Sequence, residues 1–297
     1  MDGIKKPKIL TIIVTYNGNK WVDKCFSSLR KSSIPLDVLV VDNGSTDGTI
    51  DNLKTNYPEV ELIESKDNLG FGKANNIGLN RVLEKDFDFA FLLNQDAWVE
   101  KDTIKKLLEV YTINNFGIIS PIQLSGTGDS IDLNFQNYLA PHMVKGFISD
   151  LLLNKLKPFY VTRYTNAASW LVTRKCIEMV GVFDPLFDHY GEDDDYVTRL
   201  HKSGLKMGLV PKSRIFHDRP QDLKRSPLFY KNENYILALK QAKHNKNISK
   251  TFLVRRILAN YFFLYFTSLG KNAKIKSEIA IDKLTFNLLK NHKNKFS

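Results

Sequence analysis

Short apolar runs alternate with helix-like segments through the first hundred residues, and this alternation is the strongest constraint on the fold. In chain order the runs and the amphipathic segments between them are 8–14, 21–31, 37–41, 50–56, 60–64, 73–83 and 89–93. Apolar runs of this length predict strands that are buried on both faces. Strands alternating with helices predict an α/β domain with a mostly parallel sheet that helices cover on both faces.

Polar residues follow these runs at the points where the predicted strands end. The carboxyl ends of parallel strands meet at one edge of a sheet, which is where open α/β sheets bind ligands. The run 89–93 stops at Asn94, Gln95 and Asp96. A carboxylate placed like that of Asp96 suits Mg²⁺ or Mn²⁺ sharing its coordination with a diphosphate. The alternative is that Asp96 caps the helix expected near 103–108.

Two further loops carry side chains suited to a nucleotide. Asp42 directly follows the run 37–41 and can accept hydrogen bonds from a base or ribose, although an Asx-turn is the commonest use of Asp before Asn-Gly. The segment 70–75 partly mimics a dinucleotide fingerprint, but Asn75 replaces the last Gly and the third strand precedes it, which argues against a dehydrogenase. This loop can still offer backbone N–H groups to phosphate. No Gly-Lys-Ser/Thr loop occurs, which argues against a P-loop nucleotidase.

A run of acids and a histidine mark the second half of this domain. The segment 192–195 reads Glu-Asp-Asp-Asp at the expected start of a helix, where the carboxylates raise each other's pKa. Acids there also suit the helix dipole, so a structural role is the alternative. At least one is expected to face the ligand site and take a proton from an acceptor hydroxyl. His217 follows the last short strand, 210–216, as either a structural residue or a second metal ligand. Residues 121–160 receive no assignment.

Four separated motifs occur in a consistent order along the chain. They are Thr15-Tyr16-Asn17, the segment 41–49, the segment 68–76 and Asn94-Gln95-Asp96. With the acids at 192–193 and His217, they resemble the family 2 inverting glycosyltransferases of the GT-A fold over roughly 8–220. Within that family the chain is most similar to the rhamnosyltransferase-like bacterial members that build cell-surface polysaccharides. Those members commonly show Asn-Pro/Gln-Asp in place of the usual Asp-x-Asp, as here.

The resemblance implies a role for each matching position. The residues that it places in the nucleotide-sugar site are Thr15, Tyr16, Asn17, Asp42, Asn43, Gly44, Ser45, Asn68, Gly70, Lys73, Ala74, Asn75, Asn94 and Gln95. It implies that Asp96 and His217 hold Mg²⁺ or Mn²⁺ and that Asp193 is the general base. Asn94 stands where the family usually has the first Asp, which removes one carboxylate and weakens the case for tight metal binding.

The implied reaction is a single displacement that inverts the anomeric configuration. A divalent ion offsets the charge of the leaving nucleoside diphosphate, while Asp193 deprotonates the attacking hydroxyl. By resemblance, dTDP-rhamnose is the first expected donor and a UDP-hexose the second, and the acceptor is a lipid-linked glycan. One alternative is a non-catalytic sugar-nucleotide-binding subunit with the same fold, supported by Asn94 alone. Another is a nucleotidyltransferase, whose usual Gly-rich N-terminal signature is missing.

The positive charge is concentrated at the end of the chain. Residues 221–297 hold 16 of the 43 Lys and Arg residues but 4 of the 32 Asp and Glu residues, a net charge of +12. The chain is therefore divided into a GT-A catalytic domain at 1–225 and a helical extension at 226–297. Within the extension, 257–269 is apolar and aromatic but too short to span a bilayer.

The extension is expected to bind the inner face of the cytoplasmic membrane, because basic residues flank its aromatic segment. The alternative is a helical hairpin that packs on the catalytic domain or on the other subunit of a homodimer. Nucleic acid is not expected as a partner, since the segment between the charges is too apolar for a solvated basic arm.

The cysteine content and the N-terminal residues bear on the compartment. Cys25 and Cys176 are the two cysteines and fit no metal or redox spacing, so a reducing cytosol is expected. The apolar run 9–14 is too short for a secretory signal. The sequence thus predicts a cytoplasmic enzyme that is peripheral to the membrane.

Overall fold

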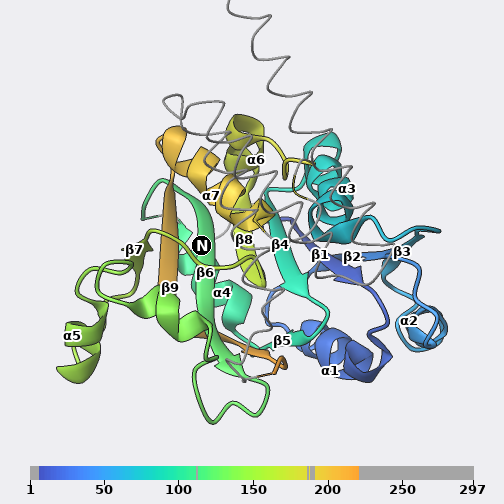
Figure 1. The fold of residues 1–297 in the computed structure, drawn as a ribbon, viewed down its shortest axis with the longest axis horizontal. Helices are drawn as coiled ribbons and strands as arrows, with labels where there is room; N and C mark the ends of the chain where they lie inside the picture. Colours follow the sequence, from blue (N-terminus) through green and yellow to red (C-terminus); the bar gives the residue numbers. More distant parts are fainter. Residues whose placement is uncertain (1–6, 112, 186, 188–190, 221–297) are drawn as a thin grey trace, which may run out of the picture. The chain divides into compact units, whose positions relative to one another are not determined.

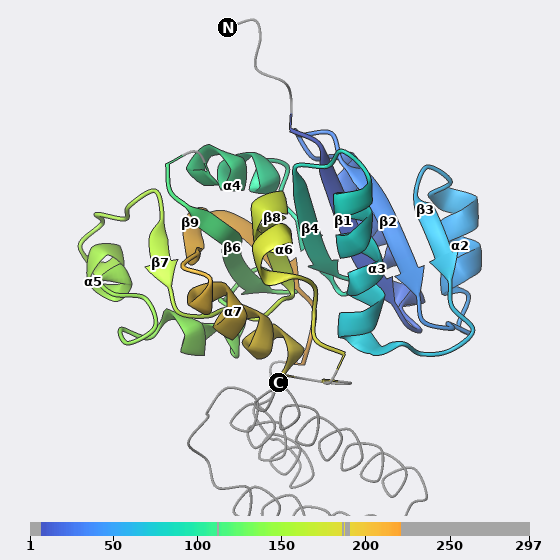
Figure 2. The same cartoon turned by 90° about the horizontal axis from the view of Figure 1, so that it is seen from above.

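In the computed structural model, the residues described are 7–111, 113–185, 187 and 191–220. These residues form a mixed sheet of nine strands with helices on both faces (Figures 1 and 2). The predicted domain boundary at 225 and the extension at 226–297 lie outside the described residues. Within the described part of the chain, no helix is both long and apolar enough to span a membrane.

The first half of the domain alternates strand and helix, as the apolar pattern predicts. Its elements are β1 (Ile9–Thr15), α1 (Asn19–Arg30), β2 (Asp37–Asp42), α2 (Thr49–Asn56), β3 (Glu61–Glu64), α3 (Gly70–Glu84) and β4 (Phe89–Asn94). Strand β1 pairs in parallel with β2 and with β4, and β2 pairs in parallel with β3. The apolar residues of β1 and β4 are almost all buried because helices lie on both sides of the sheet.

The second half is less regular. Its elements are β5 (Ala97–Val99), α4 (Thr103–Tyr111), β6 (Phe116–Ser125), the 3₁₀ turn η1 (Phe135–Leu139), α5 (Phe147–Leu152), β7 (Tyr160–Thr162), β8 (Ser169–Thr173), α6 (Arg174–Val180), α7 (Glu192–Lys202) and β9 (Lys206–His217). The strand order is β3-β2-β1-β4-β8-β6-β9-β5, and β7 also pairs with β9. In the described sheet β1–β4, β6 and β9 point one way, while β8, β5 and β7 run opposite. The predicted mostly parallel sheet is confirmed.

Alternate side chains of the central strands enter different apolar layers. Ile13 packs in the layer beneath α1, α2 and α4, whereas Ile12 packs in the layer beneath α3, α6 and α7. Helix α3 comes very close to the sheet, because a Cβ on Gly78 would lie 2.5 Å from the Ile12 side chain. Figure 1 shows α3, α6 and α7 on one side of the sheet and α1 on the other. Both layers are expected from strands that are apolar on both faces.

The carboxyl ends of the same-direction strands meet at one edge of the sheet. Thr15 is paired with Asp42, and Val14 with Asn94. At the other end of the edge, His217 is paired with Ser125. The unassigned stretch 121–160 contains the end of β6, η1, α5 and the start of β7, which enclose a small apolar cluster of their own.

Candidate active site

The Asp42 carboxylate is fully buried at the end of β2 and accepts four hydrogen bonds from described residues. Its Oδ1 accepts from the backbone N–H groups of Gly44 and Ser45, at 3.0 and 2.7 Å. Its Oδ2 accepts from the hydroxyl groups of Thr15 and Ser45, both at 2.6 Å. The Asx-turn alternative is therefore present in the structure. Asp42 holds the loop after β2 against the end of β1, and a contact with a base stays a prediction.

The loops after β1 and β2 are joined by side-chain to backbone hydrogen bonds. Asn17 has a φ of 48°, in the left-handed region that Asn tolerates. Its N–H donates to Ser45 Oγ at 2.9 Å, and its Oδ1 accepts from the Thr46 N–H at 2.9 Å. The Gly18 N–H donates to Thr49 Oγ1 at 3.0 Å. The predicted nucleotide-site residues of these two loops are thus brought together.

Gln95 supports the first loop through its side-chain amide. The Tyr16 N–H donates to Gln95 Oε1 at 2.9 Å, and Gln95 Nε2 donates to the Tyr16 carbonyl at 3.1 Å. A Cβ on Gly18 would lie 2.1 Å from Gln95 Oε1, so a glycine is required for this contact. Gln95, predicted in the nucleotide-sugar site, therefore positions the loop, and the Tyr16 side chain stays 48% exposed.

The loop before α3 is also built on side-chain amides. Asn68 Oδ1 accepts from the Gly70 N–H at 2.9 Å, and the φ of 76° at Gly70 favours glycine. Asn43 Oδ1 accepts from the Leu69 N–H at 3.3 Å, which ties this loop to the one after β2.

Within α3 itself, two predicted site residues are buried. Ala74 packs in the apolar core. Asn75 donates from Nδ2 to the Phe71 carbonyl at 3.0 Å. The structure gives both side chains packing roles within the helix layer. Lys73 lies next to them in the first turn of α3.

Asp96 and His217 meet because β5 pairs with the end of β9. Ala97 stands opposite His217 in the pairing, and the Asp218 N–H donates to the Asp96 carbonyl at 2.8 Å. Asp96 Oδ1 lies 3.3 Å from His217 Nε2. His217 is 2% exposed, and its Nδ1 has no hydrogen-bond partner among the described residues. The two residues of the predicted pair are therefore brought together. Asn94 is the last residue of β4, and its backbone N–H donates to the Ala168 carbonyl at 2.9 Å.

A carboxylate oxygen and an imidazole nitrogen at this separation fit a divalent ion. In octahedral coordination with bonds of about 2.1 Å, neighbouring ligand atoms lie about 3 Å apart. Among the described residues, no group of three His, Cys, Asp or Glu side chains is placed to hold a metal. A metal held by Asp96 and His217 would take its other ligands from the substrate and water, as Mg²⁺ commonly does.

Asp193 lies in the first turn of α7 and contacts a tyrosine that the sequence did not reveal. Its Oδ2 accepts from the Tyr164 hydroxyl at 2.6 Å, and its Oδ1 accepts from the Asp194 N–H at 2.8 Å. Burial, and next the charge of Asp193, raise the pKa of Tyr164 well above its ordinary value, so the phenol remains a donor. Tyr164 follows β7 in a stretch without periodicity, so its sequence position offered no signal.

The remaining acids of the run 192–195 are not equivalent to Asp193. Asp195 is fully buried and lies 2.8 Å from Arg199 Nε. Arg199 also donates to the carbonyls of Val180 and Val182, at 2.6 and 2.8 Å. Asp195 is therefore structural. The i, i+4 spacing of Asp195 and Arg199 is the sequence signal that points to this pair.

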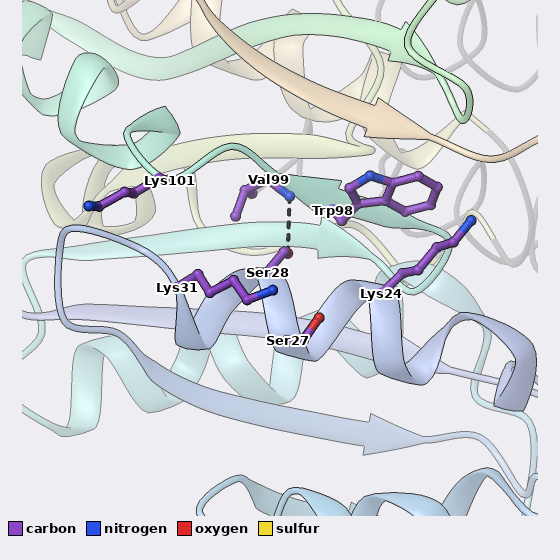
Figure 3. A pocket seen from close by; sticks show the side chains of 7 residues that line it. All are labelled: Lys24, Ser27, Ser28, Lys31, Trp98, Val99 and Lys101. Atoms are coloured by element: carbon purple, nitrogen blue, oxygen red, sulfur yellow. Dashed lines mark hydrogen bonds between the residues drawn. The ribbon is translucent and has the colours of Figure 1, made fainter.

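A separate groove of about 600 Å³ lies between α1 and β5 (Figure 3). The Val99 N–H donates to Ser28 Oγ across it at 3.1 Å, and Lys24 Nζ lies 4.7 Å from the centroid of the Trp98 ring. Its described lining is Lys24, Ser27, Ser28, Lys31, Trp98, Val99 and Lys101. That lining shares no residue with the predicted site, so the groove is not the predicted nucleotide-sugar site.

Comparison with known proteins decides the family. Residues 11–165 match the sequence profile described as Glycosyl transferase family 2. The chain belongs to glycosyl transferase family 2. The resemblance drawn from the motifs is confirmed, and the enzyme is a glycosyltransferase. The matched region contains the loops around Asp42 and Asp96, whereas Asp193 and His217 lie beyond it.

Curated relatives of this family 2 enzyme include rhamnosyltransferases. It is 26% identical over 241 residues to the N-acetylglucosaminyl-diphospho-decaprenol L-rhamnosyltransferase of Mycobacterium tuberculosis, covering 73% of this chain and 78% of the relative. It is 26% identical over 213 residues to the dTDP-rhamnosyl transferase RfbF of Shigella flexneri, covering 70% and 68%.

Solved structures show the same fold at lower identity. One is the mannosyltransferase PcManGT from Pyrobaculum calidifontis in complex with GDP-Man and Mn²⁺, with a TM-score of 0.60, 18% identity and coverage of 99% and 82%. Another is S. aureus TarS 1–349 in complex with UDP, with a TM-score of 0.55, 17% identity and coverage of 88% and 72%. The predicted GT-A fold of the family 2 enzyme is thereby confirmed.

Proposed function

We propose that this enzyme transfers a sugar, with inversion, from a nucleoside-diphosphate donor to a hydroxyl of a glycan acceptor. The observation that carries the proposal is the meeting of Asp96 and His217, 3.3 Å apart, at the carboxyl edge of the sheet. Strands β1 and β2 end at the same edge, so the motif loops that follow them begin there. Ligands bind at this edge in open α/β sheets.

The donor nucleotide would bind on the loops after β1 and β2. Their backbone is already fixed by Asp42, Asn17 and Gln95, so little ordering is required when the ligand arrives. Tyr16 has the exposed ring of the first loop and would cover the base or ribose. The segment from Asn68 to Lys73 would lie toward the ribose, diphosphate or donor sugar.

Asp96 and His217 would hold Mg²⁺ or Mn²⁺. When bound there, the ion would offset the charge of the leaving nucleoside diphosphate. The residues fit this role because they offer one oxygen and one nitrogen and leave most of the coordination sphere to substrate. The absence of a carboxylate at Asn94 predicts weaker metal binding than in members with two acids.

Asp193 would take the proton from the acceptor hydroxyl. Its Oδ2 accepts from the Tyr164 hydroxyl and its Oδ1 from the Asp194 N–H, and a carboxylate can take up a proton on either oxygen. Hydrogen bonds that a carboxylate accepts favour its charged form. Tyr164 also fixes the orientation of the carboxylate toward the attacking hydroxyl.

For the donor sugar we propose dTDP-rhamnose, with a UDP-hexose second, and for the acceptor a lipid-linked glycan. The support comes from the names of two relatives. One is a dTDP-rhamnosyl transferase, and the other is a rhamnosyltransferase named for a diphospho-decaprenol acceptor. The enzyme would then act in cell-surface polysaccharide biosynthesis, in the cytoplasm and peripheral to the membrane, as a monomer or a homodimer.

The test is a nucleotide-sugar panel read as thermal shift and as released nucleoside diphosphate. Each donor is tested with Mn²⁺, with Mg²⁺ and with EDTA, because binding raises the melting temperature by mass action. A shift and slow hydrolysis with one donor, both lost in EDTA and in Asp96→Asn, would support the proposal and identify the sugar. No shift with any donor would overturn the roles given to Asp42 and Asp96.

Asn94 supports a second candidate, a non-catalytic subunit that binds sugar nucleotides. The same panel separates the two. A donor-dependent thermal shift without transfer to any acceptor preparation, and unchanged by EDTA, would favour the binding subunit. Transfer that is lost in Asp193→Asn would exclude it.

A further inference from the structure

Helix α5 presents apolar side chains to solvent. Ile148, Leu151 and Leu152 are 37%, 40% and 76% exposed, and Leu153, directly after the helix, is 63% exposed. The first three have i, i+3, i+4 spacing and so share one face of the helix. We call these four side chains the α5 patch. Helices on a globular domain usually bury their apolar face, so this inversion marks a contact surface.

Helix α5 is anchored to the domain through Phe147 and Asp150. Phe147 is buried, and its ring centroid lies 5.3 Å from that of Tyr160. The Tyr160 hydroxyl donates to Asp150 Oδ2 at 2.8 Å, and Arg163 donates from its backbone N–H to the Met143 carbonyl at 3.1 Å. The α5 patch therefore rests on a fixed support and is not a consequence of a loose end.

Exposed basic residues flank the α5 patch along the chain. The segment 141–163 contains a single acid, Asp150, which bonds Tyr160 and lies 3.5 Å from Lys157 Nζ. Its exposed basic residues are Lys145, Lys155, Lys157 and Arg163. Apolar side chains flanked by lysine are attracted to the headgroup region of anionic lipids.

We propose that the α5 patch docks on an anionic phospholipid bilayer, with Leu152 and Leu153 at the headgroup boundary. A second protein is a poorer fit, since a stable interface needs about 800 Å² per partner and this short helix offers four apolar side chains. A bilayer requires only apolar side chains with basic flanks. The proposal does not depend on the donor or on the reaction.

The chain that borders the patch leads on to a residue that contacts the predicted general base. Arg163, in the basic border of the patch, is followed by Tyr164, which donates to Asp193. Under the proposed function, docking of α5 would bring this segment toward the membrane that carries the lipid-linked acceptor.

A fluorophore placed in the patch tests the proposal. Leu152→Cys in the full-length chain is labelled with an environment-sensitive NBD group. Cys25 and Cys176 are fully buried, and burial raises the pKa of Cys176 to about 12, so labelling is directed to the introduced thiol. Vesicles of phosphatidylglycerol and phosphatidylcholine should shift the emission to the blue and raise it several-fold. Vesicles of phosphatidylcholine alone should do so weakly.

The matched control is Thr55→Cys, labelled in the same way. Thr55 is exposed on α2, which connects the strands at the opposite end of the sheet from β7 (Figure 2). Its emission should not change. Because residues 221–297 carry a net charge of +12 in every variant, vesicle flotation alone does not report on α5, whereas the local label does.

Three outcomes would overturn the proposal. The first is a chain that floats with vesicles while the emission at position 152 stays unchanged. The second is an emission that is already blue-shifted without vesicles, which would show that protein covers the patch. The third is a chain that does not float with anionic vesicles at all.

Discussion

The loops after β1 and β2 and the segment between β6 and β8 both start at the same edge of the sheet, but they are built differently. In the first pair, the backbone N–H groups of Asn17, Gly18 and Thr46 donate to side chains that follow the other strand, and those of Gly44 and Ser45 donate to Asp42 at the start of their own loop. In the segment between β6 and β8, the Tyr164 hydroxyl donates to Asp193, the predicted general base, and α5 exposes leucines. Under the proposed function, the side that binds the donor would already be ordered by these bonds before binding, whereas the side that binds the acceptor has fewer such bonds among those described.

The largest expected effect is on the acceptor side. Asp193→Asn removes the proposed proton acceptor, so the transfer rate should fall by about 10²–10⁴-fold. The thermal shift with donor should stay, because Asp193 is on α7 and is not one of the residues proposed to bind the donor. The measurement is steady-state transfer alongside the thermal shift. Equal loss of donor binding would contradict the division into two sides.

The next effect tests the rigidity of the donor side. Asp42→Ala leaves the N–H groups of Gly44 and Ser45 and the Thr15 hydroxyl without their acceptor, which should lower the free energy of unfolding by about 2–4 kcal/mol. Donor binding should be lost as well. Urea denaturation measures the first and thermal shift the second. Asp129→Ala, in an exposed loop, is the control and should change stability much less.

A third prediction concerns pH. The Tyr164 hydroxyl stabilises the ionised form of Asp193, so Tyr164→Phe should raise the pKa of that carboxyl. The acid limb of kcat/KM against pH should therefore move to higher pH. Rates above the limb should change little.

Tyr160→Phe is the control for this pH profile, because the Tyr160 hydroxyl bonds Asp150 instead. Its acid limb should coincide with that of the unaltered enzyme. A Tyr164→Phe limb that stays in place, or one that moves downward, would show that Tyr164 does not tune the base.

The smallest effect is expected at Gly18. A Cβ there would displace the Gln95 amide and break its two bonds to Tyr16, so Gly18→Ala should raise the donor Kd several-fold. A double-mutant cycle gives the check. In a Gln95→Ala background, Gly18→Ala should have little further effect, since the clash is gone. Fully additive effects would contradict the proposed support by Gln95.

The regular half of the fold was predictable because each element carries its own signal. The runs at 8–14, 37–41 and 89–93 became β1, β2 and β4 within a residue or two. The irregular half was not, because β5 and β7 have three residues each and exist through their pairing with β9. Nothing within such short segments specifies a partner that lies far along the chain.

The candidate site was predicted as a set of residues but not as a set of contacts. Asp96 and His217 were each possible metal ligands from their positions at strand ends, and the family resemblance gave both that role. The structure places Asp96 Oδ1 3.3 Å from His217 Nε2. Gln95 and Ala74 were expected near the donor. In the structure the Gln95 amide bonds the backbone of Tyr16, and Ala74 packs in the apolar core. Tyr164 could not be found, because its approach to Asp193 depends on how the segment after β7 folds back.

Strand β9 links the part of the domain that carries α5 to the site of Asp96 and His217. It pairs with β7, next to α5, through Met207 to Leu209, and it ends at His217. Eight residues of extended chain span at most about 26 Å. With α5 resting on a bilayer, the length of β9 would set the distance of Asp96 and His217 from the lipid surface. Acceptors would then be selected by the length between their lipid anchor and the reacting hydroxyl, in addition to the identity of their sugar.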